Sequence, residues 1–274
     1  MNDVILTVEN LSVRYGDYEA VKGVSFALKR GGILGIVGES GSGKSSIAKA
    51  LMGLNPIAGG KVEIGHASAS RQQADDNKNG SGGGLQMIFQ DAVGSLNPRM
   101  KVGAAIAEAL RHGGRAEERG FSRLFKRRNS KRGDFRAGDA EALRERTLAL
   151  LKTVGLSEAV AEQYPRELSG GQCQRVSIAR ALATEPEILI ADEPVSALDV
   201  SVQARVLNLL RDLRRDTGLS ILLIAHDLAV VKNVCDDICV MERGVFVDAG
   251  PAETVFSHPQ SEYTRRLLAA VPRL

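Results

Sequence analysis

One stretch of this chain has the residue types and the spacing of a phosphate-binding loop. GESGSGKS, Gly38–Ser45, brings Gly41 and Gly43 next to a lysine and a serine. The glycines let backbone N–H groups curl around phosphate oxygens, Lys44 adds a positive charge, and the Ser45 hydroxyl can bind Mg²⁺. The sequence therefore predicts a site for a nucleoside triphosphate. Its predicted residues are Gly38, Glu39, Ser40, Gly41, Ser42, Gly43, Lys44, Ser45 and Ser46.

Two further polar groups follow apolar runs. ILIADEP contains Asp192 and Glu193, and SILLIAH ends in His226. A first carboxylate at a strand end can hold Mg²⁺, while the second is placed to orient or deprotonate a water molecule. Seen alone, such acids are more often a solvated strand end, and a lone histidine is more often structural. The phosphate loop in the same chain favours the catalytic interpretation of all three.

A second candidate anion site lies more than a hundred residues further along, in LSGGQCQRVSIARAL. Ser169, Gly170 and Gly171 lead into a helical pattern in which apolar residues recur from Val176 onward. A helix start has unbonded N–H groups and the positive end of the helix dipole, so it attracts phosphate. This second cradle has no lysine and is too weak to hold a nucleotide by itself.

The elements that must position these residues follow from the apolar pattern. Three buried-type strands are predicted over residues 32–37, 187–191 and 220–225, each followed by a helical pattern. That order favours a parallel sheet covered by helices, with the polar groups meeting at the carboxyl ends of the strands. Residues 3–30 alternate between apolar and polar types with turn signals between them, which predicts strands and hairpins. About 150 residues separate the first two buried strands, so a helical subdomain over roughly 102–183 is expected between them.

Composition sets outer limits on function. The chain has 274 residues, 43% of them apolar and 25% charged, and a net charge of +3, which is too small to indicate nucleic acid. Its longest apolar runs are far shorter than a membrane-spanning helix requires, and the N-terminus does not resemble a signal peptide. The expected compartment is the cytoplasm. Cys173, Cys235 and Cys239 are expected to be reduced core residues rather than metal ligands.

Two polar segments are expected to form loops. Residues 66–84 are polar and end in glycines, and residues 111–136 hold ten lysines and arginines against three acids. Within the basic segment, FSRLFKRR could form a short amphipathic helix. A solvated loop, contact with anionic lipid or an acidic partner loop, and nucleic acid all remain open for it.

The phosphate loop, LSGGQ, the ADEP strand end, SALD at Ser196–Asp199 and His226 occur in this order, and nearly the whole chain resembles the ATP-binding subunits of ABC transporters. The resemblance implies an α/β fold with a RecA-like P-loop ATPase core, an N-terminal antiparallel β subdomain and an inserted helical subdomain. It implies a cassette over 1–250, with the helical subdomain at about 91–182, and a family tail over 251–274. The implied cofactors are ATP and Mg²⁺.

The resemblance also assigns roles to single residues. It implies that Glu193, His226 and Gln90 are catalytic, and that Ser45, Gln90 and Asp192 bind the metal. Tyr15 matches the aromatic residue that stacks on adenine, and Asp199 matches the aspartate that bridges two subunits. In the implied head-to-tail dimer, the signature residues of each chain cover the ATP bound by its partner. These residues are Ser169, Gly170, Gly171 and Gln172.

Finer features indicate a branch of the family. Phe89–Met100, Asp199–Leu210 and Ser257–Pro272 are similar to the dipeptide, oligopeptide and nickel importer ATPases of bacteria. The expected function is ATP hydrolysis on the cytoplasmic face of the inner membrane, which drives uptake through two permease subunits and, indirectly, a substrate-binding protein. Two alternatives are an accessory ATPase of the carbon–phosphorus lyase pathway and a soluble non-transport ATPase. No iron–sulfur cluster and no nucleic-acid partner are expected.

Overall fold

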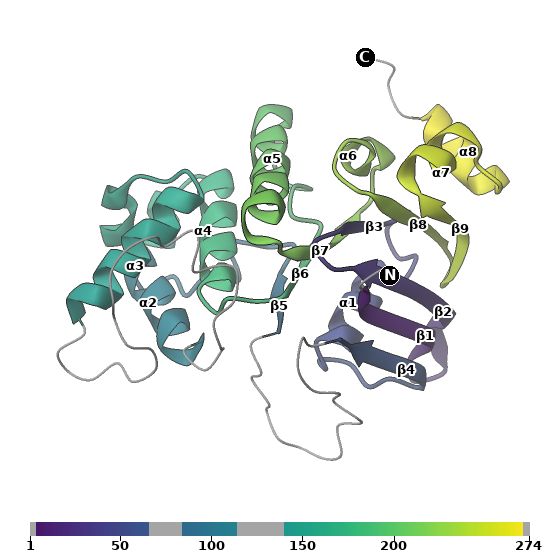
Figure 1. Cartoon of the computed structure of the whole chain (residues 1–274), viewed down its shortest axis with the longest axis horizontal. Helices are drawn as coiled ribbons and strands as arrows, with labels where there is room; N and C mark the ends of the chain where they lie inside the picture. The colour runs from purple at the N-terminus through teal and green to yellow at the C-terminus, as the bar shows by residue number, and fades with distance from the viewer. Residues whose placement is uncertain (1–3, 66–83, 114–139, 271–274) are drawn as a thin grey trace. The chain divides into compact units, whose positions relative to one another are not determined.

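A computed structural model describes residues 4–65, 84–113 and 140–270 of the chain (Figure 1). It divides into two compact units. The first comprises residues 1–80, 190–193 and 219–274, and the second comprises residues 81–189 and 194–218. Along the chain, the second unit is thus inserted into the first in two parts, which are separated by the short segment 190–193 of the first unit.

An antiparallel sheet opens the first unit. Its strands run in the order β2-β1-β4, and their bounds are β1 Val4–Tyr15, β2 Tyr18–Lys29 and β4 Gly59–Ile64. In β2, buried and exposed side chains alternate from Val24 to Lys29, because one face packs on the core and the other faces solvent. This confirms the strands and hairpins predicted for residues 3–30.

The second sheet of this unit carries the buried strands. The strand order is β6-β7-β3-β8-β9, with bounds β3 Ile33–Val37, β6 Ile188–Asp192, β7 Ser220–Ala225, β8 Asp237–Glu242 and β9 Val245–Pro251. β3 pairs in parallel with β7 and β8, while β9 returns antiparallel to β8. Every residue of β3, β6 and β7 is buried, which explains why these strands read as unbroken apolar runs. The predicted parallel sheet is confirmed.

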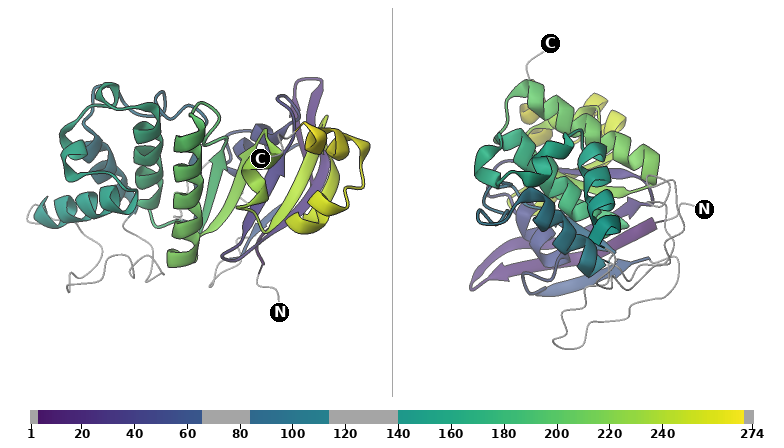
Figure 2. Two further views of the ribbon diagram at one scale, coloured as in Figure 1. Left: turned by 90° about the horizontal axis from the view of Figure 1, so that it is seen from above. Right: turned by 90° about the vertical axis from the view of Figure 1, so that its left-hand side faces the viewer.

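The helices of the first unit are α1 Lys44–Leu51, α6 Leu228–Lys232, α7 Ala252–Ser257 and α8 Glu262–Ala269. Figure 2 shows α7 and α8 beside the β8–β9 pair, at the C-terminal end of the described chain. The apolar residues Ala252 and Val255 of α7 are buried. Helices α7 and α8 are thus packed onto the sheet.

The second unit is mainly helical. It contains β5 Leu85–Ile88, α2 Val102–Gly113, α3 Ala140–Thr153, the 3₁₀ helices η2 Glu158–Glu162 and η3 Pro165–Glu167, α4 Gly170–Leu182 and α5 Val200–Thr217. Helices α2, α3 and α4 contact one another, and Ile106, Leu110, Leu150, Leu151 and Val176 are buried among their core residues. The described residues thus confirm helices between β3 and β6, while the limits of the helical subdomain, 102–183, stay a prediction.

The loop is expected to begin at residue 111, but helix α2 occupies the first residues of that segment. Arg111 belongs to α2, which continues to Gly113, because the buried residues Ile106 and Leu110 form an apolar face that packs this end of the helix on the core. The rest of that segment, with FSRLFKRR, lies outside the described residues. The same holds for the polar linker, except that Gly84 is described and accepts hydrogen bonds from the backbone N–H groups of Glu187 and Ile188.

Candidate functional site

The phosphate loop connects β3 to α1 in the first unit. An added Cβ at Gly38 would overlap the carbonyl oxygen of Met241, and one at Gly43 would overlap that of Ala20. Gly43 also has a φ of 112°, in the range that favours glycine. The loop therefore follows a path that only glycine permits at these positions, as the sequence pattern predicts.

Lys44 is the first residue of α1, and only 3% of it is exposed. Its Nζ donates hydrogen bonds to the carbonyl oxygens of Gly38, at 2.7 Å, and Glu39, at 2.8 Å. Burial lowers the pKa of the ammonium group, against the opposing charges of Glu193 and Asp192. A buried cation is thus held directly at the loop that would surround the phosphates.

Ser45 and Asp192 meet at the edge of the sheet. The Ser45 hydroxyl donates to Asp192 Oδ1 at 3.0 Å, and Asp192 is 4% exposed. Burial raises the pKa of this carboxyl, although the hydrogen bond from Ser45 acts in the opposite direction. A hydroxyl and a carboxylate oxygen side by side are the hard ligands that Mg²⁺ prefers, so the residues present fit that ion.

Glu193 follows β6 in a left-handed conformation, with a φ of 45°. Its N–H donates to the Ile224 carbonyl of β7 at 3.0 Å, which fixes this conformation. Glu193 Oε2 lies 3.7 Å from Nδ1 of His226, at the end of β7. Left-handed backbone is unfavourable for a residue with a Cβ and tends to persist where a site requires it. The carboxylate is thus placed beside the histidine and close to the buried lysine.

Tyr15 lies beside the start of α1. Its hydroxyl donates to Ser46 Oγ at 3.2 Å and accepts from Asn55 Nδ2 at 2.5 Å. With 46% of the residue exposed, the ring is accessible next to the phosphate loop. Stacking on adenine remains a prediction, and this position suits it.

The LSGGQ stretch forms the start of α4 in the second unit, as predicted. Ser169 and Gln172 form a capping box: the Ser169 hydroxyl accepts from the Gln172 N–H, and Gln172 Oε1 accepts from the Ser169 N–H at 2.8 Å. Gly170 has Leu198 as its neighbour at ordinary contact distance. An added Cβ at Gly171, by contrast, would overlap Val202 Cγ1. There is therefore space for a side chain at Gly170 but not at Gly171.

The two remaining predicted residues also belong to the second unit. Asp199 caps α5, where Oδ1 accepts from the Val202 N–H at 3.0 Å and the Ser201 hydroxyl at 2.7 Å. The hydrogen bond from Ser201 is the main reason that the pKa of Asp199 is lowered. Gln90 is exposed and follows β5. The first unit thus gathers the phosphate loop, Asp192, Glu193, His226 and Tyr15, and the second carries Gln90, Asp199 and the LSGGQ helix start.

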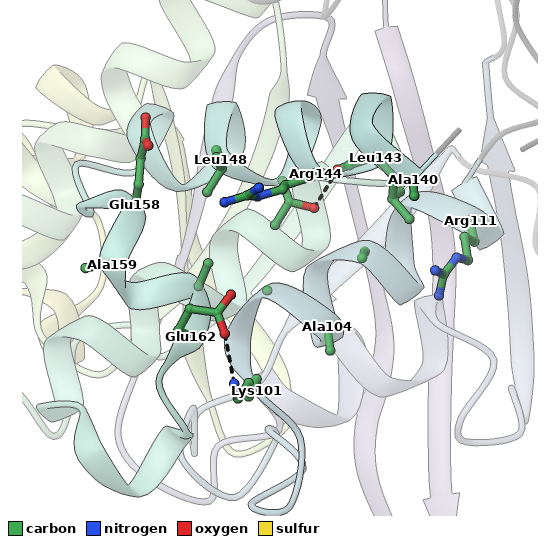
Figure 3. Close-up of a pocket in the computed structure, with 14 residues that line it drawn as sticks. Lys101, Ala104, Arg111, Ala140, Leu143, Arg144, Leu148, Glu158, Ala159 and Glu162 are labelled. Atoms are coloured by element: carbon green, nitrogen blue, oxygen red, sulfur yellow. Dashed lines mark hydrogen bonds and ion pairs between the residues drawn. The ribbon is translucent and has the colours of Figure 1, made fainter. Parts of the chain in front are cut away.

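A hollow of about 550 Å³ opens between α2, α3 and η2 of the second unit (Figure 3). Small residues line much of it, including Gly103, Ala104 and Ala107 on α2. Lys101 and Glu162 form an ion pair of 2.8 Å at its edge, and this bond lowers the pKa of Glu162. No local pattern predicts this hollow, because its walls come from three separate segments of the chain, within 101–111, 140–148 and 158–162.

Sequence reasoning also missed Tyr263, whose hydroxyl accepts a hydrogen bond from the Glu39 N–H in the phosphate loop at 3.0 Å. The three cysteines are buried, as predicted, and burial raises the pKa of Cys239 to about 12. Within ranges 4–65, 84–113 and 140–270, no group of three or more His, Cys, Asp or Glu side chains is arranged to hold a metal. Over the same ranges, no helix has the length and apolar character to cross a membrane.

Known proteins resemble this chain over most of its length. The family profile described as "ABC transporter" matches residues 21–196. The oligopeptide transport ATP-binding protein OppF of Salmonella typhimurium is 44% identical over 254 residues, which are 93% of this chain and 70% of that protein. OppF of Bacillus subtilis is 40% identical over 281 residues, 99% of this chain and 84% of that protein.

A solved structure shares the fold. It is a dimeric ATP-binding cassette in a post-hydrolysis state with ADP and Pi, with a TM-score of 0.69, 28% identity, and coverage of 90% of this chain and 99% of that one. A phosphate loop beside a strand-end carboxylate pair, on a parallel sheet, defines a P-loop ATPase. The chain belongs to the ABC transporter family and is an ATPase of that family.

Proposed function

We propose that this chain is the ATP-hydrolysing subunit of a bacterial importer of oligopeptides. The Ser45–Asp192 contact carries the proposal, because it brings a metal-binding hydroxyl and carboxylate to the buried Lys44. The relatives named as oligopeptide transport proteins support peptides over nickel and over the carbon–phosphorus lyase pathway.

In the proposed site, Ser45 and Asp192 hold Mg²⁺, with Gln90 as a further ligand. The metal ion would neutralise phosphate charge during hydrolysis. Lys44 and the loop N–H groups bind the phosphates, and Tyr15 stacks on the base. Glu193 accepts the proton of the attacking water molecule, and His226, 3.7 Å away, orients the carboxylate.

The proposed working form is a head-to-tail dimer with the same or a paralogous chain. In it, Ser169–Gln172 and Asp199 of one chain approach the ATP on the phosphate loop of the other. The solved cassette, which is dimeric, supports a dimer as the working form. An uncharged helix start suits that role, since it adds to a site that already has its own lysine.

The proposed membrane partners are two permease subunits, and the chain would lie peripherally on the cytoplasmic face of the membrane. A substrate-binding protein would be an indirect partner. We place the permease contact at the hollow of the second unit. Its small residues would leave room for side chains of a permease, and Lys101, Arg111, Arg144 and Glu162 line it with charge (Figure 3).

Uptake in cells tests this function. A strain that lacks the gene should lose uptake of labelled oligopeptides, and the wild-type gene should restore it, whereas Glu193→Gln should not. Ala104→Trp, which fills the hollow, should abolish uptake and leave the ATPase activity of the purified chain intact. Loss of Ni²⁺ uptake instead of peptide uptake, or copurification with carbon–phosphorus lyase proteins, would contradict the peptide assignment.

A further inference from the structure

The C-terminal tail contacts the phosphate loop directly. Tyr263 on α8 is 6% exposed, and its hydroxyl accepts a hydrogen bond of 3.0 Å from the backbone N–H of Glu39, 224 residues earlier in the chain. Both residues belong to the first unit. A buried hydroxyl needs a hydrogen-bond partner, and here that partner is a loop that must bind phosphate.

Glu39 is held from both sides. While its N–H bonds to Tyr263, its carbonyl oxygen accepts from Lys44 Nζ at 2.8 Å. The tyrosine, one residue of the loop and the phosphate-binding lysine therefore form a continuous chain of hydrogen bonds. A change in the position of the Glu39 backbone would alter where the ammonium group of Lys44 is held.

The position of the tyrosine is itself fixed by the sheet. Asp248 on β9 is 7% exposed and accepts from the backbone N–H groups of Gln260 and Ser261, at 3.0 and 2.9 Å. Ser261 then caps α8, because its hydroxyl accepts from the Thr264 N–H at 3.0 Å. Figure 2 shows α8 beside the β8–β9 pair. The start of α8, and Tyr263 within its first turn, are thus anchored to the core.

We propose that Tyr263 is a positioning residue for the nucleotide site, which holds the phosphate loop and Lys44 in the geometry that binds the phosphates of ATP. The tail after β9 then belongs to the nucleotide site as well as to the packing of the first unit. This inference rests on the proposed ATP site. It predicts that loss of the Tyr263 hydroxyl, with the aromatic ring retained, weakens ATP binding.

Tyr263→Phe tests the proposal, since it keeps the buried ring and removes only the hydroxyl. The dissociation constant for MgATP should rise about three- to tenfold, as expected for one hydrogen bond, while kcat at saturating ATP changes less than twofold. The backbone N–H of Glu39 should exchange with deuterium faster than in the wild-type chain. Titration calorimetry, steady-state kinetics and hydrogen exchange measure the three quantities on the full-length protein.

Ser257→Ala is the control. It removes a side-chain hydrogen bond to the Glu253 carbonyl on the neighbouring helix α7 and leaves both the cap of α8 and the tyrosine hydroxyl in place. Tyr263→Phe should raise the dissociation constant, whereas Ser257→Ala should leave it unchanged. An equal loss of affinity in both variants, or unchanged affinity in Tyr263→Phe, would overturn the proposal. Absence of ATP binding in the wild-type chain would instead overturn the ATP site itself.

Discussion

Helices α1 and α4 both follow or begin with glycines that could receive phosphate, yet the two helix starts are capped in different ways. The first residue before α1 is Gly43, which provides no side-chain cap, and Lys44 is buried beside it. The first residue before α4 is Ser169, which forms a capping box with Gln172. The start of α1 therefore has no side-chain cap, which suits the proposed contact with phosphate. The start of α4 has a cap from its own side chains and does not depend on a ligand for it.

The largest expected effect concerns chemistry on the α1 side. Glu193→Gln should slow ATP hydrolysis by about 10²- to 10⁴-fold, as expected for loss of a general base, and leave the dissociation constant for ATP nearly unchanged. Glu253→Gln, an exposed acid on α7, serves as the control. Turnover and affinity should be measured on the same preparation. Near-normal turnover would remove Glu193 from the mechanism.

The next effect separates the two helix starts by charge. Lys44→Ala should weaken ATP binding about hundredfold, because several charge-assisted hydrogen bonds to phosphate are lost. Lys61→Ala removes an exposed lysine of the same unit and should have no effect. Calorimetric titration reports both. If Lys44→Ala bound ATP as tightly as the wild-type chain, the lysine would not explain why α1, and not α4, binds the nucleotide.

A smaller effect tests whether α4 serves a neighbouring chain. Gly170→Asp should bind ATP within about twofold of the wild-type affinity, yet lose ATP-dependent dimerisation by tenfold or more, since the new carboxylate repels phosphate. Gly170→Asn has nearly the same shape without the charge and should dimerise. Gly170 is the better position, because at Gly171 the side chain would also collide with Val202. Sedimentation with ATP in the Glu193→Gln background measures dimerisation.

Mixed dimers extend that test. Chains with Lys44→Ala supply an intact LSGGQ helix start, and chains with Gly170→Asp supply an intact phosphate loop. A mixture should recover part of the dimerisation that neither variant shows alone. If Gly170→Asp removed ATP binding from the monomer, α4 would act on its own chain's nucleotide and the trans arrangement would be wrong.

The smallest effect concerns stability. Burial raises the folded-state pKa of Asp192 above 3.8, so its contribution to stability falls as pH rises from 3.8 through the folded pKa. Asp192→Asn lacks this titration. Without nucleotide, it should therefore melt at or above the wild-type temperature at pH 7, while MgATP should stabilise it less. Melting curves between pH 4 and pH 8 check this, and a clear loss of stability at pH 7 would contradict it.

The sequence predicted those parts of the fold whose signals are local. The phosphate loop is a contiguous motif, the strands of the central sheet are unbroken apolar runs, and the LSGGQ helix shows its cap and its periodicity. The contact between Ser45 and Asp192 could also be predicted, because parallel strands align their carboxyl ends at one edge of the sheet. The functional roles of these residues remain predictions.

Long-range contacts without a local signature could not be predicted. The bond between Glu39 and Tyr263 joins a backbone N–H to a tail residue, and no pattern near either one indicates the other. The close approach of Gly171 and Val202 depends on how α4 packs on α5. The left-handed backbone of Glu193 is fixed by a carbonyl of β7, which the amino-acid type does not reveal.

The close fit of Gly38 against the Met241 carbonyl has a consequence for genetic screens. Any larger residue at this position must displace the backbone of β8, so the variant chain spends more time unfolded. Cellular proteases remove unfolded chains, and the amount of protein falls before catalysis is ever measured. Variants at Gly38 should therefore be depleted in an abundance screen, whereas Glu193→Gln should pass it and fail only when growth requires transport.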